Sequence, residues 1–437
     1  MKLIHPILAI LASGALAQDD VTLTGESTET ATTPLNGLPT GPPEVLYPPH
    51  SSTIILSTAT EEAASTETES GNRTTVTKDS VTLLVGGKGT TTLTGTETSL
   101  VGNATSTSTT STAVPTNTRP CNGYPEFCER KYSNITEVAA HNSPFARTGN
   151  AASNQYLPVT TQLNDGIRML QFQSHYMNDT IYLCHTSCDI INVGTLEDYL
   201  KEVTTWLKEN PYDVLTIMMG NFDLVSPKNY SAPIEASGLI DYVYTPPKAP
   251  MGLDDWPPLS EFILSGKRAV VFLDYMANQT EVPYVLDEFS QMWETPFSPT
   301  NRDFPCNVQR PPDLPPQQAK DRLYIANHNL NTAVDLMGTS LLVPNTVVIN
   351  ETNAIEGYGS LGWMGKNCTE DWNRPPNFLL VDFYNVGSSN GSVFEVAANL
   401  NNVTYNGKCC GSESAASTLL SGNLLPVAIA AMVALFI

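Results

Sequence analysis

Two histidines, His141 and His185, stand directly after apolar runs of strand length. The ordinary pKa of imidazole is about 6.5, so one ring can act as a general base and the other as a general acid near neutral pH. Two such rings on neighbouring strands, one on each side of a phosphate, can divide that work. Either histidine alone is as typical of a hydrogen-bonded structural residue at a strand end, so the pair carries the prediction of acid–base chemistry.

The chain that must position these rings alternates apolar runs with stretches of helical period. One helix is predicted with Thr195 as its N-cap, Asp198 in a capping-box-like position and an apolar stripe over 196–207, ending at Asn210 and Pro211. Near-continuous apolar strands that alternate with such helices predict an α/β fold, a parallel sheet closed into a TIM-type (β/α) barrel. The predicted strands are 135–140, 168–172, 180–184, 214–219, 269–274, 323–326 and 378–384.

Polar side chains stand at the C-terminal ends of most of these predicted strands. In a barrel the carboxyl ends of the strands meet on one face, where active sites form. We therefore expect a shared site built from His141, Asn142, Gln173, His185, Asn221, Asp274, Asn327, His328 and Asp382.

Composition divides the 437 residues into four segments. Residues 1–17 contain one lysine, then an apolar run and then small residues of the kind found at a cleavage site. This order is typical of a secretory signal peptide; the alternative is a short buried helix. Nearly half of residues 51–118 are Ser or Thr, so 18–118 is predicted to be a disordered, O-glycosylated stalk. Residues 119–410 are then one large domain.

The last segment, 411–437, resembles a glycosylphosphatidylinositol (GPI) attachment signal. Small residues and a polar spacer precede an apolar tail over 424–437, which is shorter than the roughly 20 residues that a spanning helix needs. A single-pass helix is the alternative. We expect a secreted protein that a GPI anchor holds at the cell surface, on the outer leaflet of the plasma membrane or in the cell wall.

The charge of the chain limits its partners. Lys and Arg number 22 against 44 Asp and Glu, a formal net charge of −22. Because binding to a phosphate backbone requires clustered cations, we expect no nucleic-acid partner. We also expect a monomer.

The eight cysteines are even in number, and an exported chain favours disulfides. We expect the pairs Cys121–Cys128, Cys184–Cys188 and Cys306–Cys368, and leave Cys409 and Cys410 open. A zinc site is not favoured, because the only short cluster lacks a second ligand pair at metal spacing. Glycosylation is expected at the N-x-Ser/Thr sequons Asn72, Asn103, Asn134, Asn178, Asn229, Asn278, Asn350, Asn367, Asn390 and Asn402.

Five segments together resemble the X domain of phosphatidylinositol-specific phospholipase C and related PLC-like phosphodiesterases, in particular the secreted, GPI-anchored members of fungal type. The resemblance covers about 133–401 and implies an irregular TIM-type barrel. It rests on the order and spacing of 140–143 (AHNS), 162–168 (QLNDGIR), 182–185 (YLCH), 211–217 (PYDVLTI) and 376–384 (PNFLLVDFY).

The resemblance implies that residues at matching positions have the catalytic roles known in the family. His141 would take the proton of the inositol 2-hydroxyl, which attacks the phosphorus, and His185 would protonate the departing diacylglycerol oxygen. Asp382 would orient His141. The product would be a cyclic inositol phosphate, and the substrate a phosphoinositide or a glycosyl-inositol lipid.

The sequence departs from the family at the positions that supply a cation to the active site. Calcium-dependent members use carboxylates where this chain has Gln171, Gln173 and Met218, although Asn142 is kept. Metal-free members place an arginine where Gln173 stands. We therefore expect no cofactor and a degraded calcium site. The predicted substrate-binding residues are Asn142, Gln173, Arg147, Asn221 and His328. Arg147 is the candidate cation for the phosphate; the alternative is that Arg147 is a solvated loop residue without this role.

Other classes of enzyme fit less well. A nucleophile-elbow pattern over 387–391 has no histidine after it and contains the sequon Asn390. A glycerophosphodiester phosphodiesterase needs several carboxylates near its first histidine, where only Asp165 is available. Two hypotheses remain: an exported phosphodiester-cleaving enzyme of lipid metabolism, or a catalytically inactive surface or cell-wall glycoprotein with the same barrel.

Overall fold

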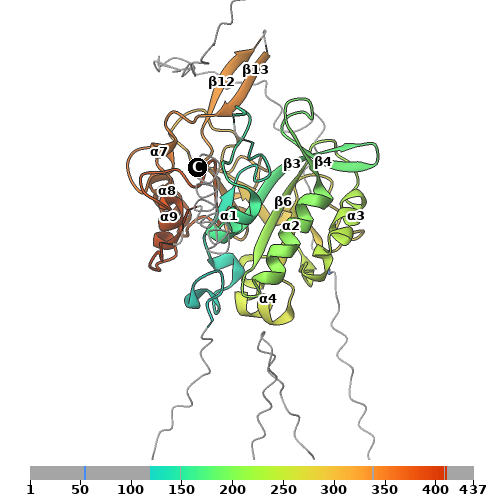
Figure 1. Ribbon diagram of the computed structural model, residues 1–437. Coiled ribbons are helices and arrows are strands. Elements are labelled where there is room, and N and C mark those ends of the chain that lie inside the picture. Colours follow the sequence, from blue (N-terminus) through green and yellow to red (C-terminus); the bar gives the residue numbers. More distant parts are fainter. Residues whose placement is uncertain (1–53, 56–118, 148, 337–338, 408, 411–437) are drawn as a thin grey trace, which may run out of the picture. The chain divides into compact units, whose positions relative to one another are not determined.

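The computed structural model describes residues 54–55, 119–147, 149–336, 339–407 and 409–410 (Figure 1). The predicted signal peptide, nearly all of the predicted stalk and the predicted anchor signal lie outside these residues. Within the described part, no helix is long and apolar enough to cross a membrane. Ile54–Ile55 (β1), in the predicted stalk, pairs antiparallel with Lys248–Ala249 (β7), which departs from the expectation that this stretch lacks regular structure.

Eight parallel strands form the main sheet, in the order β10, β11, β14, β2, β3, β6, β8, β9. The predicted α/β class and parallel, barrel-like sheet are confirmed. The two outer strands, β9 and β10, are joined by the short helix α5 (Glu288–Gln291) and are not paired with each other in the described residues. The strands are β2 (Glu137–Ala140), β3 (Met169–Met177), β6 (Leu215–Asn221), β8 (Ala269–Leu273), β9 (Val285–Asp287), β10 (Met292–Glu294), β11 (Leu323–Asn327) and β14 (Phe378–Val381).

One predicted barrel strand belongs elsewhere. The run Thr180–Cys184 is β4, which turns back from β3 and pairs with it antiparallel. Asn192–Thr195 (β5) continues this antiparallel extension beyond β4. A second antiparallel hairpin is formed by Asn331–Leu336 (β12) and Thr339–Pro344 (β13).

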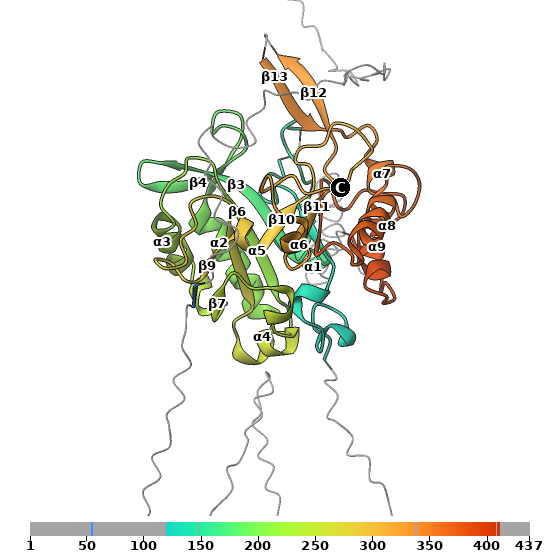
Figure 2. The ribbon, with the colours of Figure 1, turned by 180° about the vertical axis from the view of Figure 1, so that it is seen from behind.

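The helices lie outside the parallel sheet. The predicted helix is confirmed as α2 (Leu196–Glu209), whose N-cap Thr195 accepts the backbone N–H of Asp198. It contacts β4 and β5, while α9 contacts β2 on another side of the sheet (Figures 1 and 2). The other helices are α1 (Val159–Asp165), α3 (Lys228–Ala236), α4 (Leu259–Ser265), α6 (Pro316–Ala319), α7 (Ile349–Thr352), α8 (Leu361–Trp372) and α9 (Ser392–Leu400), with 3₁₀ turns at Pro125–Phe127, Tyr132–Asn134, Leu239–Asp241 and Leu253–Asp255.

The strands are buried on both faces, which explains their nearly continuous apolar sequences. Leu170 and Phe172 of β3 pack in the layer between sheet and helices, whereas Met169 packs inside the barrel with Met218 of β6. Since side chains alternate along a strand, Gln171, Gln173 and His175 belong to the inner face of β3.

The structure contains the three expected disulfides, Cys121–Cys128, Cys184–Cys188 and Cys306–Cys368, and also joins Cys409 to Cys410. Of the eight sequon asparagines in the described residues, none is buried. Five are exposed, Asn134, Asn178, Asn350, Asn390 and Asn402, and three are partly exposed, Asn229, Asn278 and Asn367.

Candidate active site

His141 and Asp382 meet at the carboxyl ends of two neighbouring strands. Val381 of β14 pairs with Ala140 of β2, and the backbone N–H of His141 donates to the carbonyl of Val381 at 3.0 Å. One residue further on, Nδ1 of His141 lies 2.7 Å from Oδ1 of Asp382. Both side chains are buried, with 7% and 1% of the residue exposed. The pairing of β2 with β14 thus builds a carboxylate–imidazole pair.

Two side chains from the loop after β2 hold this pair in place. Nδ2 of Asn154 donates to Oδ1 of Asp382 at 2.9 Å. Nε2 of Gln155 donates to the backbone carbonyls of His141 and Val381 at 2.8 and 3.0 Å. Neither residue follows a strand or a periodic pattern, so no signal in the sequence pointed to them.

The contact with Asp382 determines which nitrogen of His141 can work as a base. A carboxylate accepts hydrogen bonds, so it assigns the ring proton to Nδ1 and leaves a lone pair on Nε2. Nδ2 of Asn142 lies 3.2 Å from that Nε2. An incoming hydroxyl can replace this amide as the donor to Nε2, which is the geometry of a general base.

His185, at the end of β4, is close enough to His141 for their charges to interact. Burial, and next the nearby His141, lower the pKa of His185 to about 4, while a hydrogen bond with the backbone of Ala152 raises it in part. Its Nδ1 is buried and has no hydrogen-bond partner among the described residues, and its ring packs on Phe145 with centroids 5.3 Å apart. The His185 side chain is therefore neutral near pH 7.

Neutral side chains of β3 lie near Asn142, the residue after His141. The backbone N–H of Asn142 donates to Oε1 of Gln171 at 3.0 Å. Gln173 is level with Gly220 of β6, where a Cβ would lie 3.2 Å from its Cδ, so the glycine makes room for the glutamine side chain. In the part of the chain that the structure describes, Asn142 Oδ1, Gln173 Oε1 and Asp382 Oδ2 are buried without a hydrogen-bond partner.

This donor set does not fit calcium. Calcium requires six to eight oxygen ligands, usually with several carboxylates. Asn142 and Gln173 offer amide oxygens, Met218 and Gly220 offer none from their side chains, and Asp382 is already bonded to His141. Elsewhere in the described residues, the one grouping of three candidate metal ligands is Asp165, Cys409 and Cys410, and those two cysteines are bonded to each other.

Two of the predicted substrate-binding residues make other contacts in the structure. Arg147 is exposed, and its guanidinium donates to the carbonyl of Asn192 at 3.0 Å. Asn221 is buried, and its side chain bonds to the backbone of Val225 and Tyr275, so it shapes a loop.

His328 does not face the mouth of the barrel. It is fully buried, its Nε2 lies 2.8 Å from the carbonyl of Thr352, and its ring packs 3.9 Å from Phe304. Residues alternate at the end of β11, so Asn327 points inward and His328 points toward the helices. The expected substrate contact of His328 is therefore corrected to a packing role.

The opposite side of the mouth carries a buried network of acids around Arg310. Its Nη1 lies 3.2 and 3.1 Å from the two carboxylate oxygens of Glu294, and its Nη2 donates to the hydroxyl of Tyr275 at 2.6 Å. Burial raises the pKa of Asp274 to about 6, although Arg310 opposes that shift. Nδ2 of Asn327 also donates to Glu294, at 3.1 Å. The charge of Arg310 is therefore neutralised within this network.

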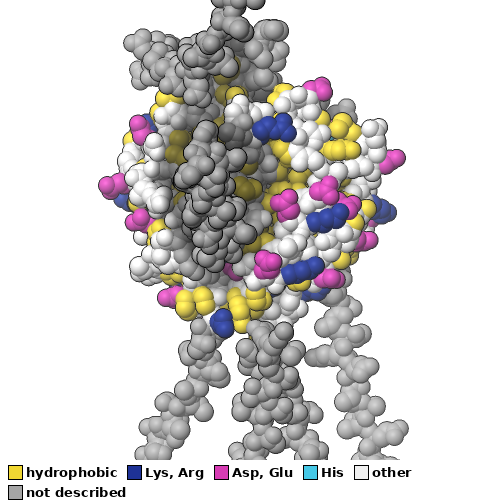
Figure 3. All heavy atoms as spheres, in the orientation of Figure 1, with side chains coloured by type: hydrophobic (Ala, Val, Ile, Leu, Met, Phe, Trp, Pro, Cys, Tyr) yellow, Lys and Arg dark blue, Asp and Glu magenta, His cyan; other side chains and the backbone are white. Residues whose placement is uncertain are grey.

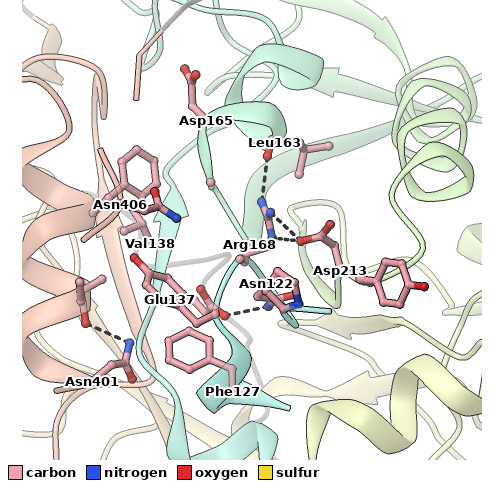
Figure 4. A pocket seen from close by; sticks show the side chains of 18 of the residues that line it. Asn122, Phe127, Glu137, Val138, Leu163, Asp165, Arg168, Asp213, Asn401 and Asn406 are labelled. Carbon is pink, nitrogen blue, oxygen red and sulfur yellow. Dashed lines mark hydrogen bonds and ion pairs between the residues drawn. The ribbon is translucent and has the colours of Figure 1, made fainter. Parts of the chain in front are cut away.

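A cavity of about 310 Å³ lies at the other end of the sheet, at the amino ends of the strands (Figure 4). There Arg168 donates to Asp213 at 2.7 Å and to the carbonyl of Leu163 at 2.8 Å, as expected of a structural arginine. Burial raises the pKa of Glu137 to about 7. The histidine pair lies beyond the carboxyl ends, so this cavity is separate from the candidate site.

On the face shown in Figure 3, acidic and basic side chains are interspersed and do not gather into one basic patch. The structure is thus that of an α/β protein with a parallel, barrel-like sheet, a carboxylate-braced histidine at the carboxyl end of β2 and a second histidine after the antiparallel β4.

Comparisons with known proteins identify the family. A sequence model described as PI-PLC X 1 matches residues 127–401. An uncharacterized secreted protein of Arthroderma benhamiae is 58% identical over 97% of this chain and 95% of its own length. A PI-PLC X domain-containing protein of the same organism is 41% identical over 61% of this chain and 86% of its own. The chain belongs to the PI-PLC X domain family.

Among solved structures, the phosphatidylinositol-specific phospholipase C of Listeria monocytogenes aligns with 62% of this chain and 95% of its own. The sequence identity is 14% and the TM-score is 0.42.

Proposed function

We propose that the protein cleaves the phosphodiester of phosphatidylinositol-type lipids by acid–base catalysis, without a resident metal. The observation that supports this proposal best is the buried pair of His141 and Asp382, 2.7 Å apart, with His185 near enough for the charges of the two rings to interact. A braced base and a second imidazole beside it are the two groups that such a reaction needs.

The proposed reaction balances within the site. Nε2 of His141 takes the proton of the inositol 2-hydroxyl, and the resulting oxygen forms a bond to phosphorus. The bond from phosphorus to the diacylglycerol oxygen breaks, and His185 gives that oxygen its proton. The products are a cyclic inositol phosphate and diacylglycerol. Because His185 is neutral at pH 7 before substrate binds, it must first take up a proton from water, and the negative charge of the bound phosphodiester favours this protonated form.

The proposal is tested with the full chain on phosphatidylinositol vesicles in EDTA and in calcium, with the product followed by phosphorus NMR. We expect cyclic inositol phosphate in both buffers, and a loss of at least about 10³-fold in kcat for His141→Ala, because a general base and its alignment are removed together. No product in either buffer, from protein with a cooperative unfolding transition, would contradict the proposal.

We further propose export and a GPI anchor for this chain. The secreted name of the 58% identical relative and the composition of 1–17 and 411–437 support this placement. Release of the protein from intact cells by an enzyme that cleaves GPI anchors would test it, and retention on the cells would contradict it.

The second candidate is a surface or cell-wall glycoprotein without catalysis. It is supported by the two arginines considered for this role in the described part of the chain: Arg147 is exposed and bonded to a carbonyl, and Arg310 is neutralised by Glu294. A phosphorane carries extra negative charge, and losing one preorganised donor to such a state typically costs about 10² to 10³ in rate. The assay above separates the two candidates.

A further inference from the structure

The cavity of about 310 Å³ at the amino ends of the strands lies away from the histidine pair (Figure 4). Its volume is within the range of small-molecule sites, about 300 to 1,000 Å³. Its walls come from the turn after Arg119, the start of β2, the end of α1 and the segment after α9. This end of the barrel thus offers room for a second small molecule.

Glu137, the first residue of β2, places a carboxylate in this cavity. Its Oε1 accepts a hydrogen bond from Nδ2 of Asn122 at 2.7 Å (Figure 4). Within the described residues Oε2 accepts no hydrogen bond, and no lysine or arginine forms an ion pair with Glu137. The side chain is only partly buried, because the cavity reaches it. An interior carboxylate without a cation is costly, so a cationic ligand would stabilise it.

The donors around the cavity are largely committed to the protein. Nδ2 of Asn122 also donates to a backbone carbonyl, and Nδ2 of Asn401 donates to two. The guanidinium of Arg168 donates to Oδ1 of Asp213 and to two backbone carbonyls. The second carboxylate oxygens of Glu137 and Asp213 remain available as acceptors. A ligand for this cavity must therefore donate hydrogen bonds.

The charge of the cavity favours a cation over an anion. Arg168 lies 2.7 Å from Asp213, so these two charges offset each other. The carboxylates outnumber the arginines among the charged residues that line the cavity, which are Arg119, Glu137, Asp165, Arg168 and Asp213. A phosphate or carboxylate ligand would meet this excess of negative charge, whereas an ammonium group would reduce it.

A divalent metal ion fits the cavity less well than an organic cation. Calcium and magnesium require several oxygen ligands around one point. In the part of the chain that the structure describes, Glu137 is not grouped with two further acids, histidines or cysteines at metal-binding distances. One carboxylate oxygen with scattered neutral acceptors is enough for an ammonium group, which has three donors.

Aromatic rings supply the remaining wall. Tyr124 and Phe127 both line the cavity, with ring centroids 4.7 Å apart. Two other rings that line it already carry cations: Arg119 lies 5.5 Å from the ring centroid of Tyr212, and Arg168 lies 5.1 Å from that of Trp206. An aromatic face attracts a cation and also packs against an alkyl chain.

We propose that this cavity binds a small organic cation with a primary ammonium group, with Glu137 as its counter-ion and Tyr124 and Phe127 as its aromatic wall. The site does not depend on the proposed hydrolysis, because Glu137 begins β2 whereas His141 follows its carboxyl end.

Calorimetry on the full chain at pH 8 tests the ligand class with three probes of similar size. Propylammonium has both charge and N–H donors, 1-propanol lacks the charge, and tetramethylammonium lacks the donors. We expect saturable one-to-one binding of propylammonium, and binding at least about tenfold weaker for the other two, because each loses part of a charge-assisted hydrogen bond. No saturable binding of propylammonium, or equal binding of 1-propanol, would overturn the proposal.

Variants test the residues. Glu137→Gln keeps the size of the side chain and should weaken propylammonium binding by at least about tenfold. Tyr124→Leu keeps an apolar side chain without the ring and should weaken it by about threefold. Glu126→Gln is the matched control, because Glu126 is an exposed acid nearby that does not line the cavity. Unchanged affinity in Glu137→Gln, or an equal loss in Glu126→Gln, in proteins that unfold cooperatively, contradicts the site.

The affinity should also depend on pH through Glu137. Burial raises the pKa of Glu137 to about 7, although Asn122 and Arg168 oppose this shift. The carboxyl group is thus mostly neutral at pH 6 and mostly ionised at pH 8, while an alkylamine keeps its charge. Propylammonium binding should tighten by about tenfold between these values.

The other charged or titratable groups near Glu137 or on the cavity wall are Arg119, Tyr124, Tyr132, Asp165, Arg168, Tyr212, Asp213 and Tyr405. Burial raises the pKa of Tyr124, Tyr132 and Tyr405, so these three hydroxyls stay neutral over this range. Glu137→Gln should therefore bind propylammonium equally at pH 6 and pH 8. A wild type without pH dependence, or a variant that keeps it, would show that Glu137 is not the counter-ion.

Discussion

Oδ1 of Asp382 accepts hydrogen bonds from two directions, from Nδ1 of His141 and from Nδ2 of Asn154. Its carboxylate therefore fixes both the position and the tautomer of His141, while the amide of Asn154 fixes the carboxylate. The chemistry assigned to His141 depends on this chain of contacts as much as on the imidazole itself.

Asp382→Asn should separate orientation from folding. The amide keeps the size of the carboxylate but can hold His141 in the wrong tautomer, with Nε2 protonated. We expect kcat on phosphatidylinositol to fall by about 10³- to 10⁴-fold, the range known for a carboxylate that orients a catalytic histidine. Asn154→Ala, which removes one bond to Asp382, should cost less. A value of kcat within about threefold of the wild type for Asp382→Asn would contradict the orienting role.

At the scale of elements, the convergence of strand ends in a parallel sheet predicted that His141 and Asp382 would meet, whereas His185 comes to this end of the sheet on the antiparallel β4. The sequence also predicted α2 from its cap and stripe, and six of the eight strands of the parallel sheet; the short β9 and β10 were not predicted. The alternation of side chains between the two faces of a strand could also have been used. It places Asn327 inward and His328 outward at the end of β11, and it places His175 on the inner face of β3. Asn154 and Gln155 were out of reach, because an irregular loop has no period.

The hairpin of β3 and β4 was the missed element, and its signal was present. Asn178 and Asp179 join the two strands with φ of 50° and 59°, the left-handed conformation that Asn and Asp tolerate in two-residue hairpin turns. An apolar run over 180–184 alone cannot distinguish a barrel strand from a returning one. This turn is what carries His185 back toward His141.

The disulfide Cys184–Cys188 closes a small loop around His185, whose carbonyl accepts the N–H of Ser187 at 2.7 Å. The double variant Cys184→Ala with Cys188→Ala should lower kcat by about tenfold or more, because His185 loses its fixed position. Its Tm should change little, since closing so short a loop restricts the unfolded chain only slightly. Mild reductant should likewise lower activity before the barrel unfolds.

The disulfide Cys306–Cys368, with a sequence separation of 62, is the matched control. Its removal should lower Tm by several degrees, because it closes a long loop, and leave kcat of the folded protein close to the wild type. Activity that survives the loss of Cys184–Cys188 would show that this loop does not position His185.

At the scale of the whole molecule, two sets of buried groups respond to pH in opposite ways. Burial lowers the pKa of His185 to about 4 and that of His328 to about 3, so the folded state disfavours their cations. Burial raises the pKa of Glu137 and of Asp287 to about 7, so the folded state disfavours their anions. Between pH 4.5 and 6.5 the histidines make the fold more stable as pH rises, and the carboxyl groups make it less stable.

These opposed contributions predict opposite slopes for two variants. His328→Asn removes a group that stabilises the fold as pH rises, so its free energy of unfolding should fall relative to the wild type from pH 5 to 6.5. Glu137→Gln removes a group that destabilises the fold as pH rises toward 7, so its relative free energy of unfolding should rise. Each slope is at most about 1.4 kcal/mol per pH unit.

Guanidinium unfolding at pH 5, 6 and 7 measures both slopes. Asp254→Asn is the control for charge removal, since the side chain of Asp254 is fully exposed, and its slope should match the wild type. The decisive observation is the sign of each slope relative to the wild type, because burial disfavours the cation of His328 but the anion of Glu137. Slopes of the same sign for His328→Asn and Glu137→Gln would mean that at least one of these groups keeps its ordinary protonation in the folded protein.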